Sequence, residues 1–151
     1  AYDGVKGLMD RAVKAGAKIL TGGTRPKGMK APFLAPTVME NITNDMEIAQ
    51  EEIFGPVATL IKFKTEEEVV AMANDTPFGL ASYFYTQDMK RTFRVAEALE
   101  YGMVGANLGH ISSLAAPFGG YKESGIGRES SSYGIEEFLE TKYIAIGELH
   151  Q

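Results

Sequence analysis

The stretch Glu51-Glu52-Ile53-Phe54-Gly55-Pro56 connects a polar segment to the apolar run 57–63. The two acids are not needed to form the strand that follows them. They suit a turn that presents a carboxylate and a flat ring to a ligand. Glu52 and Phe54 are two positions apart, so their side chains point to the same side of an extended backbone. Such a pair could accept hydrogen bonds from sugar hydroxyls and pack against a heteroaromatic ring. The alternative is that both acids cap or solvate a short helix while Phe54 fills the core.

On either side of this stretch, hydrophobic periodicity and turn residues predict strands that alternate with helices. Helices are expected over 3–15, from the N-cap Thr65 to about residue 74, from the N-cap Asp88 to before Gly102, and over 132–140. Thr65 and Glu68 form a capping-box pattern, and Gly16 marks the end of the first helix. Residues 41–50 are polar and turn-like. Strands are expected over 18–21, 33–39, 57–63, 80–85, 103–107 and 143–146. This alternation predicts an α/β fold with a mostly parallel sheet and flanking helices.

The bulk composition restricts the classes of function. With 151 residues and 44% apolar content, the chain is long enough to bury a core and is expected to form one domain. The net charge of −5, without clusters of Lys or Arg, argues against nucleic acid and against an anionic membrane as partners. No apolar run approaches the roughly 20 residues that span a bilayer, so a cytoplasmic location is expected. The absence of cysteine and the wide separation of His110 from His150 predict no metal site.

A long loop with many Gly and Ser residues, 108–130, follows the strand predicted over 103–107. Loops of this length are usually functional. Its glycines match neither the GxGxxG pattern nor a phosphate-binding loop, so we expect them to form tight turns, with Arg128 and Glu129 as structural partners. His110 is expected to be an ordinary loop residue. The second half of the loop is Pro117-Phe118-Gly119-Gly120-Tyr121-Lys122-Glu123-Ser124-Gly125-Ile126-Gly127-Arg128-Glu129.

The motifs EEIFGPV (51–57) and PFGGYKESGIGRE (117–129) resemble the C-terminal part of NAD(P)-dependent aldehyde dehydrogenases, and the resemblance covers residues 5–149. The loop 108–130 and the segment YGIEEFLETKY (133–143) are most similar to succinate-semialdehyde dehydrogenases. The family chain is much longer, so the resemblance implies that residues 1–141 are part of a catalytic domain. It also implies that 142–151 form a terminal strand and tail. This strand would join an oligomerisation sheet between the subunits of a homo-oligomer, either a dimer or a tetramer.

The resemblance also assigns contacts to cofactor and substrate. It implies that Glu52 holds the ribose hydroxyls of NAD or NADP and that Phe54 packs near the nicotinamide ring. It implies that Phe118 walls the reactive centre and that Ser112 lies in the aldehyde tunnel, where many relatives carry an aromatic residue. A small hydroxyl there would favour an aldehyde with an acid tail, while Ser113 is expected to face away. The alternative for Ser112 is a hydrogen bond to its own turn.

These assignments imply a parent enzyme that oxidises succinate semialdehyde, or a similar carboxylated aldehyde, to the acid with NAD or NADP. In the family a cysteine thiolate attacks the aldehyde, and that cysteine lies upstream of this segment. No catalytic residue is therefore assigned, and the isolated chain is expected to be inactive. Two alternatives stay open. One is a structural or assembly fragment without activity; the other is an aldehyde dehydrogenase of another specificity, such as one for glutarate semialdehyde or a neutral aldehyde.

Overall fold

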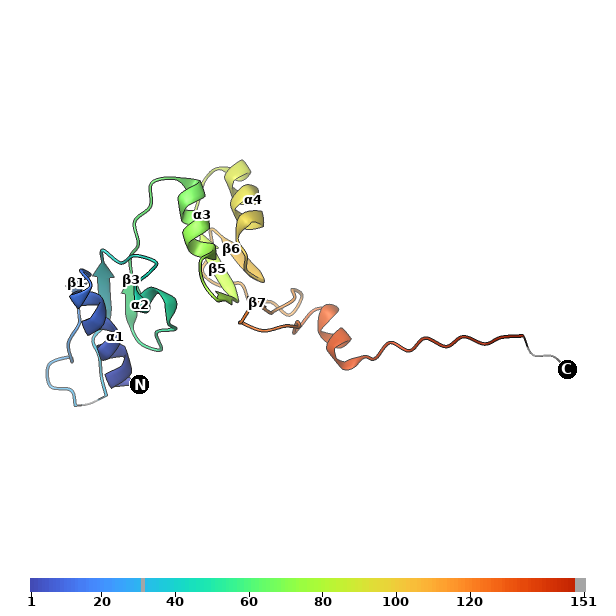
Figure 1. Cartoon of the computed structure of the whole chain (residues 1–151), viewed down its shortest axis with the longest axis horizontal. Helices are drawn as coiled ribbons and strands as arrows, with labels where there is room; N and C mark the ends of the chain where they lie inside the picture. Colours follow the sequence, from blue (N-terminus) through green and yellow to red (C-terminus); the bar gives the residue numbers. More distant parts are fainter. Residues whose placement is uncertain (31, 149–151) are drawn as a thin grey trace. The chain divides into compact units, whose positions relative to one another are not determined.

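The computed structural model describes residues 1–30 and 32–148, and its contacts divide the chain into two compact units, Ala1–Thr76 and Pro77–Gln151 (Figure 1). The first unit contains the helices α1 (Tyr2–Lys14), α2 (Glu47–Gln50) and α3 (Glu66–Asn74), and the strands β1 (Lys18–Thr21), β2 (Thr37–Glu40) and β3 (Val57–Thr59). These strands form a sheet in the order β1-β2-β3, in which β1 is antiparallel and β3 parallel to the central strand.

The core of the first unit lies between α1 and the central strand of the sheet. One face of α1 is apolar, so Val5, Met9 and Ala12 are buried on it. Met9 and Met39 of β2 are both fully buried, with 0% of each exposed. Ile48 of α2 belongs to the same apolar cluster. Burying a side chain of this size contributes about 1.5–3 kcal/mol, so these contacts hold both helices to the sheet.

The predicted helix signals of the first unit are confirmed. The Thr65 hydroxyl oxygen accepts a hydrogen bond from the Glu68 N–H at 3.1 Å, and the Glu68 carboxylate accepts one from the Lys64 N–H at 2.6 Å. Gly16 follows α1 with a φ of 109°, a conformation that favours glycine after a helix end. The Thr65 cap, supported by the Glu68 bond to the preceding residue, therefore sets the start of α3, and Gly16 sets the end of α1.

The second unit contains β4 (Phe78–Gly79), β5 (Ala81–Phe84), α4 (Met89–Ala98), β6 (Met103–Ala106), β7 (Tyr121–Lys122) and the 3₁₀ helix η1 (Tyr133–Phe138). β5 and β6 are parallel, whereas β4 and β7 are antiparallel. The predicted N-cap of α4 is confirmed, because the Asp88 carboxylate accepts hydrogen bonds from the Lys90 and Arg91 N–H groups at 2.8 and 3.2 Å.

The α/β class is confirmed by this mixture of helices and sheets. Parallel pairing joins β2 to β3 and β5 to β6, and antiparallel pairing joins β1 to β2 and β4 to β7. In the described part of the chain, the mostly parallel sheet of the prediction is observed as three small sheets: β1-β2-β3 is mixed, β5-β6 is parallel and β4-β7 is antiparallel.

Several elements differ from the prediction in length or type. The strand expected over 57–63 ends at Thr59, because its partner β2 ends at Glu40. The strand expected over 33–39 begins only after Pro36, which has no N–H to donate to a ladder. The helix expected over 132–140 is the 3₁₀ helix η1, and the turn-like segment 41–50 contains α2.

The strand expected over 143–146 is not formed within this chain. Residues 139–148 follow η1 as an extended segment in Figure 1 and pair with no other strand among the described residues. Residues 149–151, which include His150, lie outside the described part of the chain. The pairing of this segment between subunits and the boundary at 141/142 stay predictions.

None of the helices in residues 1–30 and 32–148 combines the length and the apolar character needed to cross a membrane.

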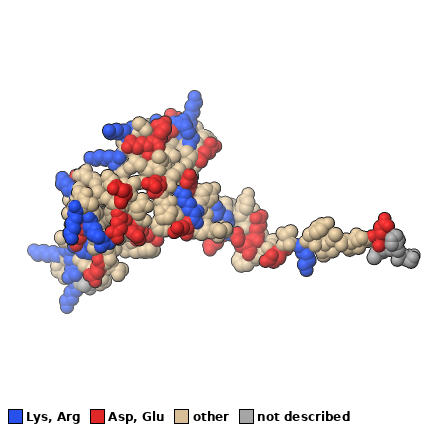
Figure 2. Space-filling model, in the orientation of Figure 1, with Lys and Arg blue, Asp and Glu red and all other residues tan. Residues whose placement is uncertain are grey.

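Acidic and basic side chains are interspersed on the face of the molecule drawn in Figure 2.

Candidate functional site

An open groove in the first unit brings Glu52 and Phe54 together. Its volume is about 430 Å³, and it is lined by residues of α1, by Glu47 of α2 and by Glu51, Glu52 and Phe54 of the turn that follows α2. The Phe54 ring is 79% exposed, and the Glu52 side chain is exposed as well. No residue in the described part of the chain donates a hydrogen bond to the Glu52 carboxylate or forms an ion pair with it. A carboxylate and a ring are therefore both available to a ligand.

Two parts of the alternative do not fit this arrangement, namely that the acids cap a helix and that Phe54 fills the core, whereas exposed acids beside a short helix do fit it. The adjacent helix, α2, ends at Gln50, so Glu51 and Glu52 follow its C-terminus, where the helix dipole disfavours a negative charge. The exposure of Phe54 excludes it from the core. An acceptor carboxylate beside a flat ring fits a ligand that carries neighbouring hydroxyls and a flat heterocycle.

Arg11 and Glu47 line the same groove, and no sequence pattern pointed to them. The Arg11 guanidinium donates two hydrogen bonds to the Glu47 carboxylate, from Nε to Oε2 at 2.5 Å and from Nη2 to Oε1 at 2.8 Å. Hydrogen bonding to Arg11 lowers the pKa of Glu47 below its usual value; desolvation opposes this shift and charge attraction adds to it. The same hydrogen bonding raises the pKa of Arg11. Both groups are consequently charged at neutral pH.

In the second unit, Asn107 fixes the start of the long loop. Its φ is 59°, a left-handed conformation that Asn tolerates better than most residues. Its side-chain Oδ1 accepts a hydrogen bond from the Thr86 N–H at 2.8 Å, and its Nδ2 donates one to the Thr86 carbonyl at 2.7 Å. These two bonds tie the ends of β5 and β6 together, so the loop 108–130 begins from a fixed point.

A small cavity brings Ser112 and Phe118 together. Its volume is about 290 Å³, and the rest of its wall is formed by Ser113, Leu114, Glu129 and Ser130. The Ser113 hydroxyl accepts a hydrogen bond from the Ala115 N–H at 3.3 Å. Ser113 is part of the same cavity wall as Ser112, and the expectation that it faces away from a substrate stays a prediction. The bond to its own turn, considered for Ser112, is made by Ser113.

Backbone contacts hold Phe118 in this cavity wall. Its N–H donates to the Glu129 carbonyl at 2.8 Å, and the Glu129 N–H donates to the Phe118 carbonyl at 2.7 Å. The next residue, Gly119, lies directly against Gly102, since a β-carbon on Gly102 would come within 2.0 Å of the Gly119 carbonyl oxygen. The loop is therefore packed against the start of β6 without a layer of side chains between them.

Arg128 holds the glycine-rich end of the loop. Its Nη1 donates to the Gly120 and Gly127 carbonyls at 3.0 and 2.7 Å, and its backbone N–H donates to the Glu137 carboxylate at 3.2 Å. Gly125 and Gly127 have positive φ values of 115° and 96°. These contacts confirm the predicted tight turns and the structural role of Arg128.

The two residue pairs of the predicted site lie in different units, Glu52 and Phe54 in the first and Ser112 and Phe118 in the second. His110 is exposed on the loop. Within residues 1–30 and 32–148, no three His, Cys, Asp or Glu side chains are grouped so that they could hold a metal ion.

Comparison with known proteins identifies relatives of this chain. The aldehyde dehydrogenase family matches residues 1–144. A glutarate-semialdehyde dehydrogenase of Pseudomonas putida is 57% identical over 138 residues, which are 91% of this chain and 28% of that protein. An NADP(+) succinate-semialdehyde dehydrogenase of Escherichia coli is 52% identical over 136 residues, 90% of this chain and 28% of that protein. A crystal structure of an aldehyde dehydrogenase from Brucella melitensis biovar abortus is 57% identical with a TM-score of 0.87, over 95% of this chain and 29% of that one. This chain thus spans little more than a quarter of the length of these relatives.

Proposed function

The chain belongs to the aldehyde dehydrogenase family, and from this premise we propose that it is the C-terminal part of an enzyme that oxidises a short aldehyde with an acid tail, with NAD or NADP as cofactor. Succinate semialdehyde is the first candidate substrate and glutarate semialdehyde the second, since relatives that are 52% and 57% identical carry these names. The observation that carries the proposal is the exposed pair of Glu52 and Phe54 in the groove of the first unit.

Glu52 and Phe54 would hold the nicotinamide half of the cofactor. A carboxylate accepts two charge-assisted hydrogen bonds from the neighbouring hydroxyls of a ribose, and no described residue competes for the Glu52 oxygens. The Phe54 ring offers a flat apolar face to a heterocycle. When bound, NAD or NADP supplies the hydride acceptor for the oxidation of the aldehyde. The contribution of this chain is to orient that group.

Ser112 and Phe118 would form one wall of the aldehyde site. The Ser112 hydroxyl can donate a hydrogen bond to an acid tail, and the Phe118 ring excludes water from one side. Glu129 lines the same cavity, and no Lys or Arg is among the described residues that line it. An acid tail therefore also needs a cation from another part of the protein. The nucleophilic cysteine must come from outside the chain as well, because the chain contains none.

We extend the proposal to assembly and location. The segment 142–147 would pair with another subunit of a dimer or tetramer, since its backbone groups have no ladder partner among the described residues. The parent enzyme is proposed to be cytoplasmic.

The variant Glu52→Gln tests the cofactor contact in the intact parent enzyme. The substitution keeps the shape of the side chain and removes its charge, so we expect a loss of about 1–3 kcal/mol, seen in single-turnover hydride transfer. Unchanged hydride transfer together with a lower melting temperature would show instead that Glu52 supports the fold.

Steady-state kinetics of the wild-type parent enzyme test the substrate class. We expect higher kcat/KM for succinate and glutarate semialdehyde than for a neutral aldehyde of similar length, with either NAD or NADP. A preference for the neutral aldehyde would overturn the assignment of an acid tail and leave the family membership intact.

A further inference from the structure

The ion pair between Arg11 and Glu47 connects two helices that are far apart in the sequence. Arg11 lies in the last turn of α1, and Glu47 begins α2, 36 positions later. Its two bonds form a fork, the arrangement in which an arginine–carboxylate pair is strongest and most directional. The side chains are 53% and 50% exposed, and exposed ion pairs contribute little to overall stability. The importance of this fork therefore lies in the segment that it holds in place.

The helix α2 depends on contacts outside itself. It is a single turn of four residues, and no side chain caps its N-terminus. A turn of this length is not stable alone, because helix nucleation is unfavourable. Ile48, which is 2% exposed, anchors α2 in the core. Gln50, at the other end of α2, donates from Nε2 to the Asn44 and Asp75 carbonyls at 2.7 and 3.3 Å. The fork from Arg11 adds a side-chain link from the first residue of α2 to α1.

The position of α2 determines where the turn with Glu52 and Phe54 begins. The Glu47 carbonyl accepts a hydrogen bond from the Glu51 N–H at 2.9 Å, so the residue that Arg11 holds is bonded directly to the residue before Glu52. After the turn, α1 touches Gly55, where an added β-carbon would lie 2.9 Å from Val5 Cγ2. The helix α1 thus contacts the chain on both sides of the exposed pair.

Arg11 also balances the charge of the groove. Among the described residues that line it, Arg11 is the one basic side chain beside the carboxylates of Glu47, Glu51 and Glu52. Without Arg11, three carboxylates would face a dinucleotide that is itself negatively charged, and their repulsion would weaken its binding.

We propose that Arg11 is a positioning residue for the cofactor: through its fork to Glu47, it fixes the turn that presents Glu52 and Phe54. This inference rests on the proposed function, because it concerns the same groove. Arg11 acts through Glu47 and is not itself assigned a contact with the cofactor.

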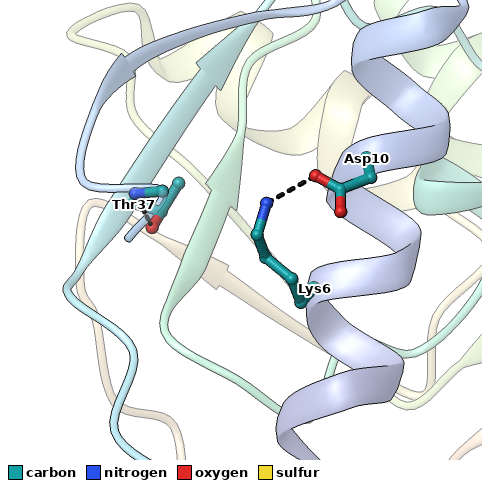
Figure 3. Close-up of polar contacts among 4 residues, drawn as sticks. Lys6, Asp10 and Thr37 are labelled. Atoms are coloured by element: carbon teal, nitrogen blue, oxygen red, sulfur yellow. Dashed lines mark hydrogen bonds and ion pairs between the residues drawn. The ribbon is translucent and has the colours of Figure 1, made fainter. Parts of the chain in front are cut away.

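A second ion pair on α1 provides a matched control. Lys6 and Asp10 are joined at 2.5 Å, and both residues belong to α1, so this pair makes no link to α2 (Figure 3). The substitutions Arg11→Gln and Lys6→Gln each remove one positive charge from the same helix, but only Arg11→Gln breaks the fork. In the intact parent enzyme, we expect Arg11→Gln to weaken the binding of NADH or NADPH about fivefold or more. Lys6→Gln should leave the affinity unchanged, as measured by fluorescence titration of the reduced cofactor.

Three more measurements separate positioning from a general loss of stability. Hydrogen exchange followed by mass spectrometry should show faster exchange confined to the peptides that cover 47–54 in Arg11→Gln. Arg11→Lys keeps the positive charge and loses the fork. Its affinity for NADH or NADPH should therefore lie between those of the wild type and Arg11→Gln. The reversed pair, Arg11→Glu combined with Glu47→Arg, should recover much of the affinity that Arg11→Glu loses alone.

Equal affinities of Arg11→Gln and Lys6→Gln would overturn the positioning role and leave the proposed function in place. If the reversed pair binds NADH or NADPH no better than Arg11→Glu alone, the positioning role would also be overturned and the proposed function would stand. If Arg11→Gln does not fold, Arg11→Lys decides, and a wild-type affinity of that variant would count against the role. A wild-type enzyme that binds neither NADH nor NADPH would overturn the proposed function itself, and the positioning role with it.

Discussion

Two neighbouring serines differ in what their hydroxyl groups can do. The Ser113 hydroxyl accepts a hydrogen bond from the Ala115 N–H at 3.3 Å, whereas no described residue is bonded to the Ser112 hydroxyl. Both serines line the cavity that contains Phe118. Ser112 is therefore able to donate to a substrate, while Ser113 supports the turn on which both residues lie.

The substitution Ser112→Ala in the intact parent enzyme should lower kcat/KM for succinate semialdehyde about tenfold. A hydroxyl that donates to a charged acceptor contributes roughly 1.5–3 kcal/mol, and about 1.4 kcal/mol corresponds to a factor of ten. A neutral aldehyde of similar length should be almost unaffected. Ser113→Ala is the matched variant. It loses a turn contact, so it should lower kcat/KM for succinate semialdehyde and for the neutral aldehyde by the same factor. An equal loss for both substrates in Ser112→Ala would show that this hydroxyl holds the loop and not the substrate.

At the scale of helices and strands, the sequence predicted the elements whose ends depend on local contacts. Thr65 and Asp88 bond to N–H groups two or three positions later, and both helices begin there. The helix α2 was not predicted, because its single turn has no periodic pattern and is held by Arg11, 36 positions away. The strand β3 is shorter than predicted, since a strand extends only as far as its partner.

In the candidate site, too, the sequence predicted the residues that are near one another in the chain and missed those that are far apart. Glu52 and Phe54 were predicted as cofactor contacts from the sequence because they are close neighbours in one motif. Arg11 and Glu47 were not found, since only the folded chain brings them to the same groove. Leu114 and Glu129 were not predicted to lie beside Ser112 for the same reason, although they line the same cavity.

The terminal segment should act as an association surface in the isolated chain. Tyr143, Ile144 and Ile146 are 88%, 70% and 79% exposed, and residues 140–147 pair with no strand among the described residues. Unpaired backbone groups beside exposed apolar side chains favour pairing with another copy. We expect light scattering to show self-association that Ile146→Lys reduces, because a charge on an edge opposes pairing. A monomer at high concentration would contradict this expectation.

At the scale of the whole molecule, the chain contains the groove with the proposed cofactor contacts Glu52 and Phe54 and the cavity with the proposed substrate contacts Ser112 and Phe118, and its sequence contains no cysteine. It covers 28% of the length of its Escherichia coli relative. We expect the purified chain alone to show no NAD- or NADP-dependent oxidation of succinate semialdehyde, because its sequence lacks the cysteine that the proposed reaction needs. Absorbance of the reduced cofactor measures this, with the intact parent enzyme as positive control. Turnover by the chain above a protein-free blank would contradict the expectation.

Gly102 and Gly119 meet backbone to backbone, with the position of a Gly102 β-carbon only 2.0 Å from the Gly119 carbonyl oxygen. This contact restricts which base changes the codon for Gly102 can tolerate. A single-base change at the first or second position of a glycine codon introduces a residue with a β-carbon or a stop signal, whereas a change at the third position keeps glycine. At Gly102, no one-step missense change can therefore leave the Phe118 loop where it lies. In a population of genes that encode this protein, the codon for Gly102 should accumulate synonymous changes while amino-acid replacements are removed by selection.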